Sequence, residues 1–275
     1  MTLRRLLYLL CLGASATTLV GCGGDTLSLD PVANAASKTA ESDSARVTFD
    51  ATVRAGSIGT MSFSGHGIFD GRSKTGWMDM TFDLPAQAQL GGNPSMEMIF
   101  DGRDGVVMYM RSSMFPGVPA EMWVKMDLEK LADQEGFDLG AVMNANQADP
   151  HQTLRMLMAS SDARPSGSEF VRGVRTTRYS FRVDLERLAD ENEDLRESLD
   201  EVLQVTGTSA FPGQAWIDAQ GRVRKLMIAM SLSSPAAGRV TMEMTQELYD
   251  FGVRAEIQPP ADEQVVDIAA LMGNS

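Results

Sequence analysis

Cysteine and histidine are scarce in this chain of 275 residues, which has two of each. Most metal sites and thiol chemistries need more of these side chains than the sequence offers. Basic residues are also few, since 24 Lys and Arg face 37 Asp and Glu, which gives a net charge of −13. Because a polyanion is repelled by phosphate backbones, we expect no nucleic-acid partner. The hydrophobic share of 43% is that of a packed globular protein.

The sequence also lacks the short motifs that mark common catalytic sites. It contains no Gly-x-Ser-x-Gly elbow, no His-Glu-x-x-His pair and no Gly-x-x-x-x-Gly-Lys loop. His66 and His151 are the candidates for a catalytic base, but no nucleophile stands beside either in the sequence. The many carboxylates leave a hydrolase with paired carboxylates open. We nevertheless expect a protein that is not an enzyme and that uses no cofactor and no metal.

The amino terminus has the features of an export signal. Arg4 and Arg5 precede an apolar run of 15 residues, Leu6 to Val20. This run is shorter than the roughly 20 residues that span a bilayer, and it fits the apolar core of a signal peptide. The run ends in Leu19-Val20-Gly21-Cys22, which resembles a bacterial lipobox. The resemblance implies cleavage before Cys22 and attachment of a diacylglyceryl group to its sulfur.

This signal predicts how the chain is divided. Residues 1–21 are expected to form the signal peptide, 22–30 the acylated cysteine and its tether, and 31–275 a single domain. Because Cys11 is lost with the signal, only Cys22 remains and the domain holds no disulfide. Two or more acyl chains hold a protein stably on a membrane, so we expect an exported protein anchored to the outer face of the cell membrane. An ordinary secretory signal with a chance cysteine is the alternative.

From Ala45 onward, apolar residues recur with the period of two that is typical of half-buried strands. We count about eleven strands with one apolar face, which indicates an antiparallel meander in an α+β fold. The expected strands cover 46–54, 61–68, 77–83, 96–100, 106–111, 122–126, 168–174, 175–184, 214–218, 223–232 and 239–249. Helices are expected over 30–41, 127–133, 149–158 and 185–205.

Methionine is the residue in excess, with 19 copies against 18 aromatic residues. Met-x-Met pairs recur at strand spacing, at Met78/Met80, Met96/Met98, Met108/Met110 and Met242/Met244. Thioethers can bind Cu(I), but no His or Cys stands near these pairs in the sequence. The methionines can fill an ordinary core, or they can line an adaptable apolar cavity, because methionine is unbranched and polarizable. We favour the cavity, since a close-packed core draws more naturally on Leu, Ile and Val.

The predicted cavity lining takes the alternate, apolar positions of these strands. It comprises Met78, Met80, Phe82, Met96, Met98, Phe100, Met108, Met110, Met242 and Met244. Asp79, Glu97 and Arg111 occupy intervening positions and should face water, because neighbouring residues of a strand point to opposite faces.

The order of these segments resembles the LolA/LppX-type bacterial lipoproteins, the group that includes LprA, LprF and LprG. The resemblance covers most of residues 31–271. It depends on the lipobox, the first helix, the meander, the helix that begins at Asp149-Pro150, the segments 167–179 and 215–225, and Tyr249-Asp250-Phe251-Gly252. It implies a half-open β-barrel, which is a strongly curved antiparallel sheet whose concave face is covered by helices.

The resemblance also implies a function without catalysis. The protein would bind the acyl chains of a lipid, glycolipid or lipoprotein and carry or present them at the cell envelope, with an envelope transporter or another lipoprotein as partner. Each buried CH₂ group contributes about 0.8 kcal/mol, so a chain of about sixteen carbons offers roughly 12 kcal/mol before the costs of ordering it. The alternative is a structural or sensory lipoprotein with a filled core, which binds another envelope protein and carries no lipid.

Overall fold

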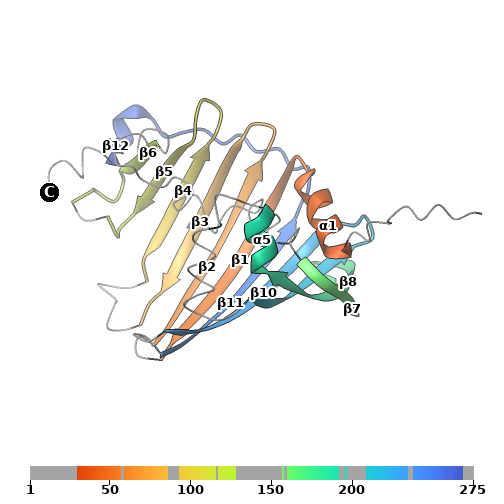
Figure 1. The fold of residues 1–275 in the computed structure, drawn as a ribbon. Coiled ribbons are helices and arrows are strands. Elements are labelled where there is room, and N and C mark those ends of the chain that lie inside the picture. The colour runs from red at the N-terminus through yellow and green to blue at the C-terminus, as the bar shows by residue number, and fades with distance from the viewer. Residues whose placement is uncertain are drawn as a thin grey trace, which may run out of the picture.

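The computed structural model of the chain describes residues 30–56, 59–85, 93–115, 117–127, 160–191, 209–234 and 238–268, together with Leu157 and Arg196 (Figure 1). The predicted signal peptide, Cys22 and almost all of the tether lie outside these residues. So do His151, most of the helices expected over 127–133 and 149–158, and most of the second half of the helix expected over 185–205. Among the described residues, no helix has both the length and the apolar character needed to cross a membrane.

One curved sheet of twelve strands, which does not close on itself, forms the body of the molecule (Figure 1). Its order is β12-β6-β5-β4-β3-β2-β1-β11-β10-β9-β8-β7, and only the β12–β6 pair is parallel. The strands are β1 (Ser44–Ala55), β2 (Gly59–Asp70), β3 (Thr75–Asp83), β4 (Ser95–Asp101), β5 (Val107–Ser112), β6 (Trp123–Asp127), β7 (Ser160–Val171), β8 (Val174–Asp184), β9 (Ala210–Asp218), β10 (Val223–Ser234), β11 (Gly238–Tyr249) and β12 (Val265–Asp267).

The predicted curved antiparallel sheet is therefore confirmed, with two differences. The sheet has one strand more than the eleven expected, because the apolar tail adds the three-residue strand β12 beside β6. Strand β7 begins at Ser160, eight residues before the expected start. This part of β7 contains Pro165 and shifts of register against β8, which hide the alternation that sequence analysis relies on.

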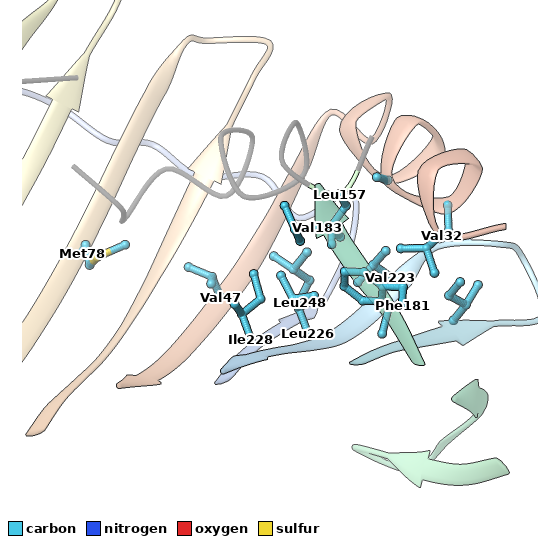
Figure 2. Packing of buried hydrophobic residues seen from close by; sticks show 14 of the residues in the cluster. Val32, Val47, Met78, Leu157, Phe181, Val183, Val223, Leu226, Ile228 and Leu248 are labelled. Carbon is cyan, nitrogen blue, oxygen red and sulfur yellow. The ribbon is translucent and has the colours of Figure 1, made fainter. Parts of the chain in front are cut away.

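The two faces of the sheet differ in what packs on them. We call the face that carries Val47, Met78, Leu226 and Leu248 the inner face, and the opposite one the outer face. Helix α1 (Pro31–Ala40) buries its apolar side in the same cluster as these residues (Figure 2). The register across β2, β1 and β11 places Gly67, Val47 and Leu248 in one row. The apolar face predicted from the alternation therefore runs continuously through the centre of the sheet.

Helix α1 begins where Asp30-Pro31 predicts. The Asp30 carboxylate accepts the backbone N–H groups of Val32 (2.8 Å) and Ala33 (3.3 Å), so it caps the helix. It also accepts the hydroxyl of Ser160 at 3.1 Å, which joins the start of α1 to the start of β7. Of the described helices, α1 lies against β7, β9 and β10, and the short α5 (Leu185–Glu191) lies against β8. Helical cover over the rest of the inner face stays a prediction.

Phenylalanine rings lie over glycines of neighbouring strands on the inner face. A Cβ atom on Gly65 would stand 2.5 Å from Cε1 of Phe49 and 2.6 Å from the carbonyl oxygen of Asp79. The ring of Phe69 covers Gly76 in the same way, and the ring of Phe181 covers Gly213. Because each glycine leaves room for a ring from the next strand, the aromatic residues pack flat against the backbone of the curved sheet.

We predict that Gly65→Ala lowers the free energy of unfolding by about 2 kcal/mol, because the new methyl group must displace the Phe49 ring and the backbone of β3. Urea denaturation followed by tryptophan fluorescence measures the change. Ser64→Ala, on the outer face of the same strand, is the matched control and should change stability little. Equal effects of the two variants would contradict the packing described here.

Three hairpin turns at one end of the sheet are closed by an aspartate and an arginine. Arg72 donates its backbone N–H to Asp70 at 3.0 Å in the turn between β2 and β3. The turns after β4 and β9 repeat the arrangement, with Asp101/Arg103 and Asp218/Arg222. Such contacts satisfy backbone donors that the turn leaves outside the sheet ladder.

Asp218 is the most buried of these carboxylates, with a fully buried side chain. Its Oδ2 accepts Nε of Arg224 at 2.8 Å and Nη2 of Arg222 at 3.1 Å. Burial opposes ionisation of Asp218, but the backbone N–H of Arg222 and the guanidinium groups of Arg224 and Arg222 outweigh it and hold the pKa of this carboxyl below its ordinary value.

Because the pKa of Asp218 is lower in the folded than in the unfolded chain, its stabilisation is complete above about pH 4 and is lost as the pH falls through the folded-state pKa. Asp218→Asn should therefore cost about 3 kcal/mol at neutral pH and make the loss of stability in acid less steep. Urea denaturation over a pH series measures both effects. The control Asp101→Asn removes a more exposed pair and should cost less than about 1 kcal/mol. Equal losses at neutral pH would contradict this ranking.

Candidate ligand-binding face

The structure places all ten residues of the predicted lining on the inner face. Strand register joins Met80 to Gly65 and Met96, and Phe82 to Phe63, in rows that continue to β1. The row of Phe82 and Phe63 continues through Ala51 of β1 to Met244 of β11, and Met242 lies on the same face, opposite Val53. The ten side chains thus share one face, although whether they enclose a cavity stays a prediction.

Methionines of β3, β4 and β5 form a ladder on this face. Met78 lies opposite Met98, and Met98 lies opposite Met110. Met80 likewise lies opposite Met96, and Phe100 lies opposite Met108. Directly opposed residues on one face of an antiparallel pair have Cβ atoms about 5 Å apart, so these side chains lie next to one another. They form one thioether-rich patch, which we call the methionine patch.

Burial within the methionine patch is uneven. Met78, Met108 and Met98 are 2%, 7% and 9% exposed and belong to the core. Five other members of the predicted lining are only half-buried, although they point to the same side: Met80, Phe82, Met96, Phe100 and Met110. The inner face therefore combines a packed base with apolar side chains that keep contact with solvent. Thioethers and phenyl rings offer no strong hydrogen-bond donor, so this surface suits a hydrocarbon ligand.

Met242 and Met244 form a second group, which is separate from the methionine patch. Strands β1 and β2 lie between the two groups, and β2 contributes Gly65 and Gly67 to the inner face. The ring of Phe49 fills the space above Gly65. The rings of Phe49 and Phe63 therefore lie on the inner face between the two groups of methionines.

Besides Met61 of β2, which lies opposite Val53, two further methionines on the inner face are not among the ten predicted lining residues. Met126 on β6 lies opposite Met108, and Met230 on β10 lies opposite Met242. Both pack against the buried core. The alternation of apolar residues in β6 and β10 would have placed both methionines on the inner face, but neither residue belongs to a Met-x-Met pair.

The charged residues of these strands occupy the outer face. Asp79 lies opposite Glu97, which in turn lies opposite Arg111. Glu97 accepts Nε1–H of Trp77 at 2.7 Å and forms an ion pair with Arg111. The Arg111 guanidinium stands 4.6 Å from the centre of the Trp123 ring. Glu97 and Arg111 are thus tied into an outer-face network and keep partial contact with water.

His66 is an exposed residue of the outer face, and its ring meets the edge of Trp77 at a centroid distance of 5.4 Å. It lines an open hollow of about 410 Å³ together with Asp50, Asp79 and Thr81. No cysteine belongs to the described residues, and no cluster of three or more metal-ligating side chains occurs among them.

No family model matches the sequence. An uncharacterized 31.2 kDa protein of Streptomyces griseus, encoded in the rplA–rplJ intergenic region, is 26% identical over 244 residues, which cover 86% of this chain and 77% of that protein. Similar solved structures include LprF from Mycobacterium bovis, with a TM-score of 0.46 and 12% identity, covering 84% of this chain and 95% of LprF.

Lipoprotein LppX from Mycobacterium tuberculosis is also similar, with a TM-score of 0.42, 12% identity and coverage of 84% of this chain and 97% of LppX. A LolA superfamily protein from Nitrosomonas europaea has a TM-score of 0.29 and 9% identity and covers 82% of this chain and 93% of its own. The chain resembles the LolA/LppX-type lipoproteins. These are the proteins to which the segment order of the sequence points.

Replacing single methionines separates packing from lining. Met78→Ala should lower the free energy of unfolding by about 3 kcal/mol, because it leaves a cavity in the packed base. Met96→Ala should cost roughly 1 kcal/mol or less, because its half-buried side chain is not enclosed on all sides. Urea denaturation of the two variants measures the difference. Equal, large losses would indicate a solid core and would count against a ligand-binding face.

Proposed function

We propose that this protein is an exported lipoprotein, anchored to the outer face of the cell membrane through Cys22, that binds acyl chains on its inner face. Its cargo would be a lipid, a glycolipid or the acyl groups of another lipoprotein, which it carries or presents within the cell envelope. An envelope transporter or an acylated protein would be its partner. We propose no catalytic function and no cofactor.

The observation that carries this proposal is the half-buried, contiguous apolar surface on an unclosed sheet. Met80 lies opposite Met96, and Phe82, Met110 and Phe100 lie elsewhere on the same face of β3–β5; all five side chains keep contact with solvent. Contiguous apolar surface is costly in water, and where a soluble protein retains it, the surface commonly binds a partner or a ligand. An acyl chain would remove this surface from water without requiring polar recognition along its length.

The supporting geometry favours a ligand that can slide and adapt. Methionine has three rotatable bonds, so a row of methionines can adjust to chains of different length and unsaturation. The ligand would enter over β3–β5, whereas the tightly packed cluster around α1 holds the frame (Figure 2). A structural lipoprotein would need only the tightly packed part of the sheet. The half-buried methionine patch therefore favours a protein that carries acyl chains.

Lipid extraction tests the function directly. The full-length protein is expressed in a bacterial host that acylates lipoproteins, purified in mild detergent, delipidated with organic solvent and analysed by mass spectrometry. We expect co-purified acyl lipids in addition to the anchor. Protein that carries no lipid and takes none up from vesicles would support the structural or sensory alternative, and a protein partner would then be sought by pull-down from native membranes.

A charge in the methionine patch should weaken binding. Met80→Glu places a carboxylate against the ligand, and we expect at least a tenfold loss of affinity for a fluorescent fatty-acid probe, because desolvating an unpaired charge costs more than about 1.4 kcal/mol. Thr81→Glu puts the same charge on the outer face at the next position and serves as the control. Unchanged binding by Met80→Glu would remove the inner face from the proposed function.

A further inference from the structure

A phenylalanine ring is exposed at the tip of the β7–β8 hairpin, which forms one end of the sheet (Figure 1). Phe170, the last residue but one of β7, is 71% exposed, whereas every other phenylalanine that the structure describes is buried or half-buried. Among the described residues, Met114, at 38%, is the other large apolar side chain that is exposed. Single exposed rings are common on protein surfaces, so the surroundings of Phe170 decide whether it has a partner.

The two sides of this hairpin tip differ in burial. Phe170 lies opposite Arg175 on one side, and both residues are exposed. On the other side, Val171 and Thr176 are 5% and 2% exposed. The alternation along β8 puts Arg175 on the same side as Phe181, which belongs to the core of the inner face. Phe170 therefore stands at the rim of the inner face and points away from the buried side of the hairpin.

Arg172, in the turn after β7, holds the tip in place. Its Nε donates to Oε2 of Glu247 at 2.7 Å, and its Nη2 donates to the hydroxyl of Thr48 at 3.1 Å. The guanidinium also stands 3.9 Å from the centre of the Tyr249 ring. Because these contacts tie the turn to β1 and β11, Phe170 is presented at a defined place, and little conformational entropy is lost when it meets a partner.

The hairpin is cationic in a chain that is strongly acidic. Between residues 163 and 183 there are five arginines and one acidic residue, Glu169, whereas the whole chain has a net charge of −13. The arginines are Arg164, Arg172, Arg175, Arg178 and Arg182. All of them are exposed except Arg178, which is half-buried. An anionic surface attracts this hairpin and repels the acidic remainder, so it orients the protein with Phe170 toward the surface.

The predicted lipid anchor joins the domain beside this hairpin. The Asp30 carboxylate accepts the hydroxyl of Ser160 at 3.1 Å and the backbone N–H of Ala163 at 3.2 Å, at the start of β7. Cys22 lies eight residues before Asp30, and a chain of that length reaches at most about 28 Å. The strand from Ala163 to Phe170 extends about 23 Å. Cys22 and Phe170 can therefore contact the same membrane.

We propose that the tip of the β7–β8 hairpin docks on an anionic lipid membrane. Phe170 enters the boundary between headgroups and acyl chains, and the surrounding arginines bind lipid phosphate groups, for which the planar guanidinium is suited. This inference goes beyond the proposed function and depends on it for the anchor at Cys22 alone. Docking turns the rim of the inner face toward the bilayer that would supply or receive an acyl chain.

A dye next to Phe170 tests the docking. Only Cys22 remains in the mature chain and the anchor blocks it, so Ser168→Cys in the acylated full chain offers a single thiol on the same side of β7 as Phe170. An environment-sensitive fluorophore is attached there, and the protein is bound to vesicles of phosphatidylcholine with or without phosphatidylglycerol. We expect blue-shifted emission and quenching by spin-labelled lipids on the anionic vesicles, and a weaker signal on phosphatidylcholine alone. The same dye at Glu121→Cys, before β6 near the opposite end of the sheet, should stay in water on both.

Substitutions in the labelled protein separate the ring from the charge. Phe170→Ser should lower the ratio of docked to undocked protein about tenfold, because the ring no longer leaves water. Arg175→Gln should narrow the difference between the two kinds of vesicle, as should high salt, which screens the attraction. Met114→Ser removes the other exposed apolar side chain and is the matched control, which should change neither. Because these side chains are exposed, urea denaturation should give midpoints close to that of the unsubstituted protein.

The possible failures can be told apart. A dye that stays in water on anionic vesicles, or a signal that Phe170→Ser leaves unchanged, would overturn the docking surface. Labelling of the unsubstituted protein would show that Cys22 is free and that the anchor fails; co-sedimentation with the same vesicles then tests the docking, and Phe170→Ser must again weaken it. Protein that docks but yields no lipid on extraction would refute the carrier and keep the docking surface.

Discussion

The pairing of β1 with both β2 and β11 is the interaction on which the rest of the structure depends. It joins the meander β2–β6, which follows β1 directly, to the strands β7–β11, which lie more than a hundred residues further along the chain. In the β1–β11 register, Val47 lies opposite Leu248 and Phe49 opposite Gln246. A slip of one residue would turn every side chain of one half to the wrong face. Both groups of methionines share one face only because this register holds.

The inner face combines two kinds of packing that serve different purposes. Around α1, small and branched side chains such as Val32, Ala36 and Val223 pack tightly and leave almost no exposed surface (Figure 2). Toward β3–β5 the face changes to methionine and phenylalanine, and burial becomes incomplete. A rigid base with a pliable surface beside it is what a carrier of variable chains needs, because the frame keeps its shape while the lining adjusts.

On the outer face, several charged residues form ion pairs, and several guanidinium groups lie over aromatic rings. Glu97 with Arg111 is an example. Arg172, from the turn between β7 and β8, reaches Glu247 at 2.7 Å and lies 3.9 Å from the centre of the Tyr249 ring. These contacts tie the strand ends together on the side that faces water. The apolar side is thereby left free of competing charge.

The amino-acid sequence alone determined the local features of this protein. The alternation of Val47 with Thr48, or of Met78 with Asp79, fixes strand and face because neighbouring side chains of a strand point in opposite directions. Asp70-Gly71-Arg72 marks a turn because the Asp70 carboxylate accepts the backbone N–H of Arg72. Arg172-Gly173 marks a turn because both residues adopt a positive φ. Asp30-Pro31 marks the start of α1 because the Asp30 carboxylate accepts the backbone N–H of Val32.

Only the tertiary structure decided which strands become neighbours and which side chains they bring together on the inner face. Strand β1 has β11 as its second partner, and β12 pairs in parallel with β6, because long-range pairing depends on how the whole sheet curves and not on any local pattern. The same packing separates Met242 and Met244 from the methionine patch. It also buries Gln246, a polar residue in the sequence, between Phe49 and Leu226 on the inner face, since burial is a property of the surroundings of a residue.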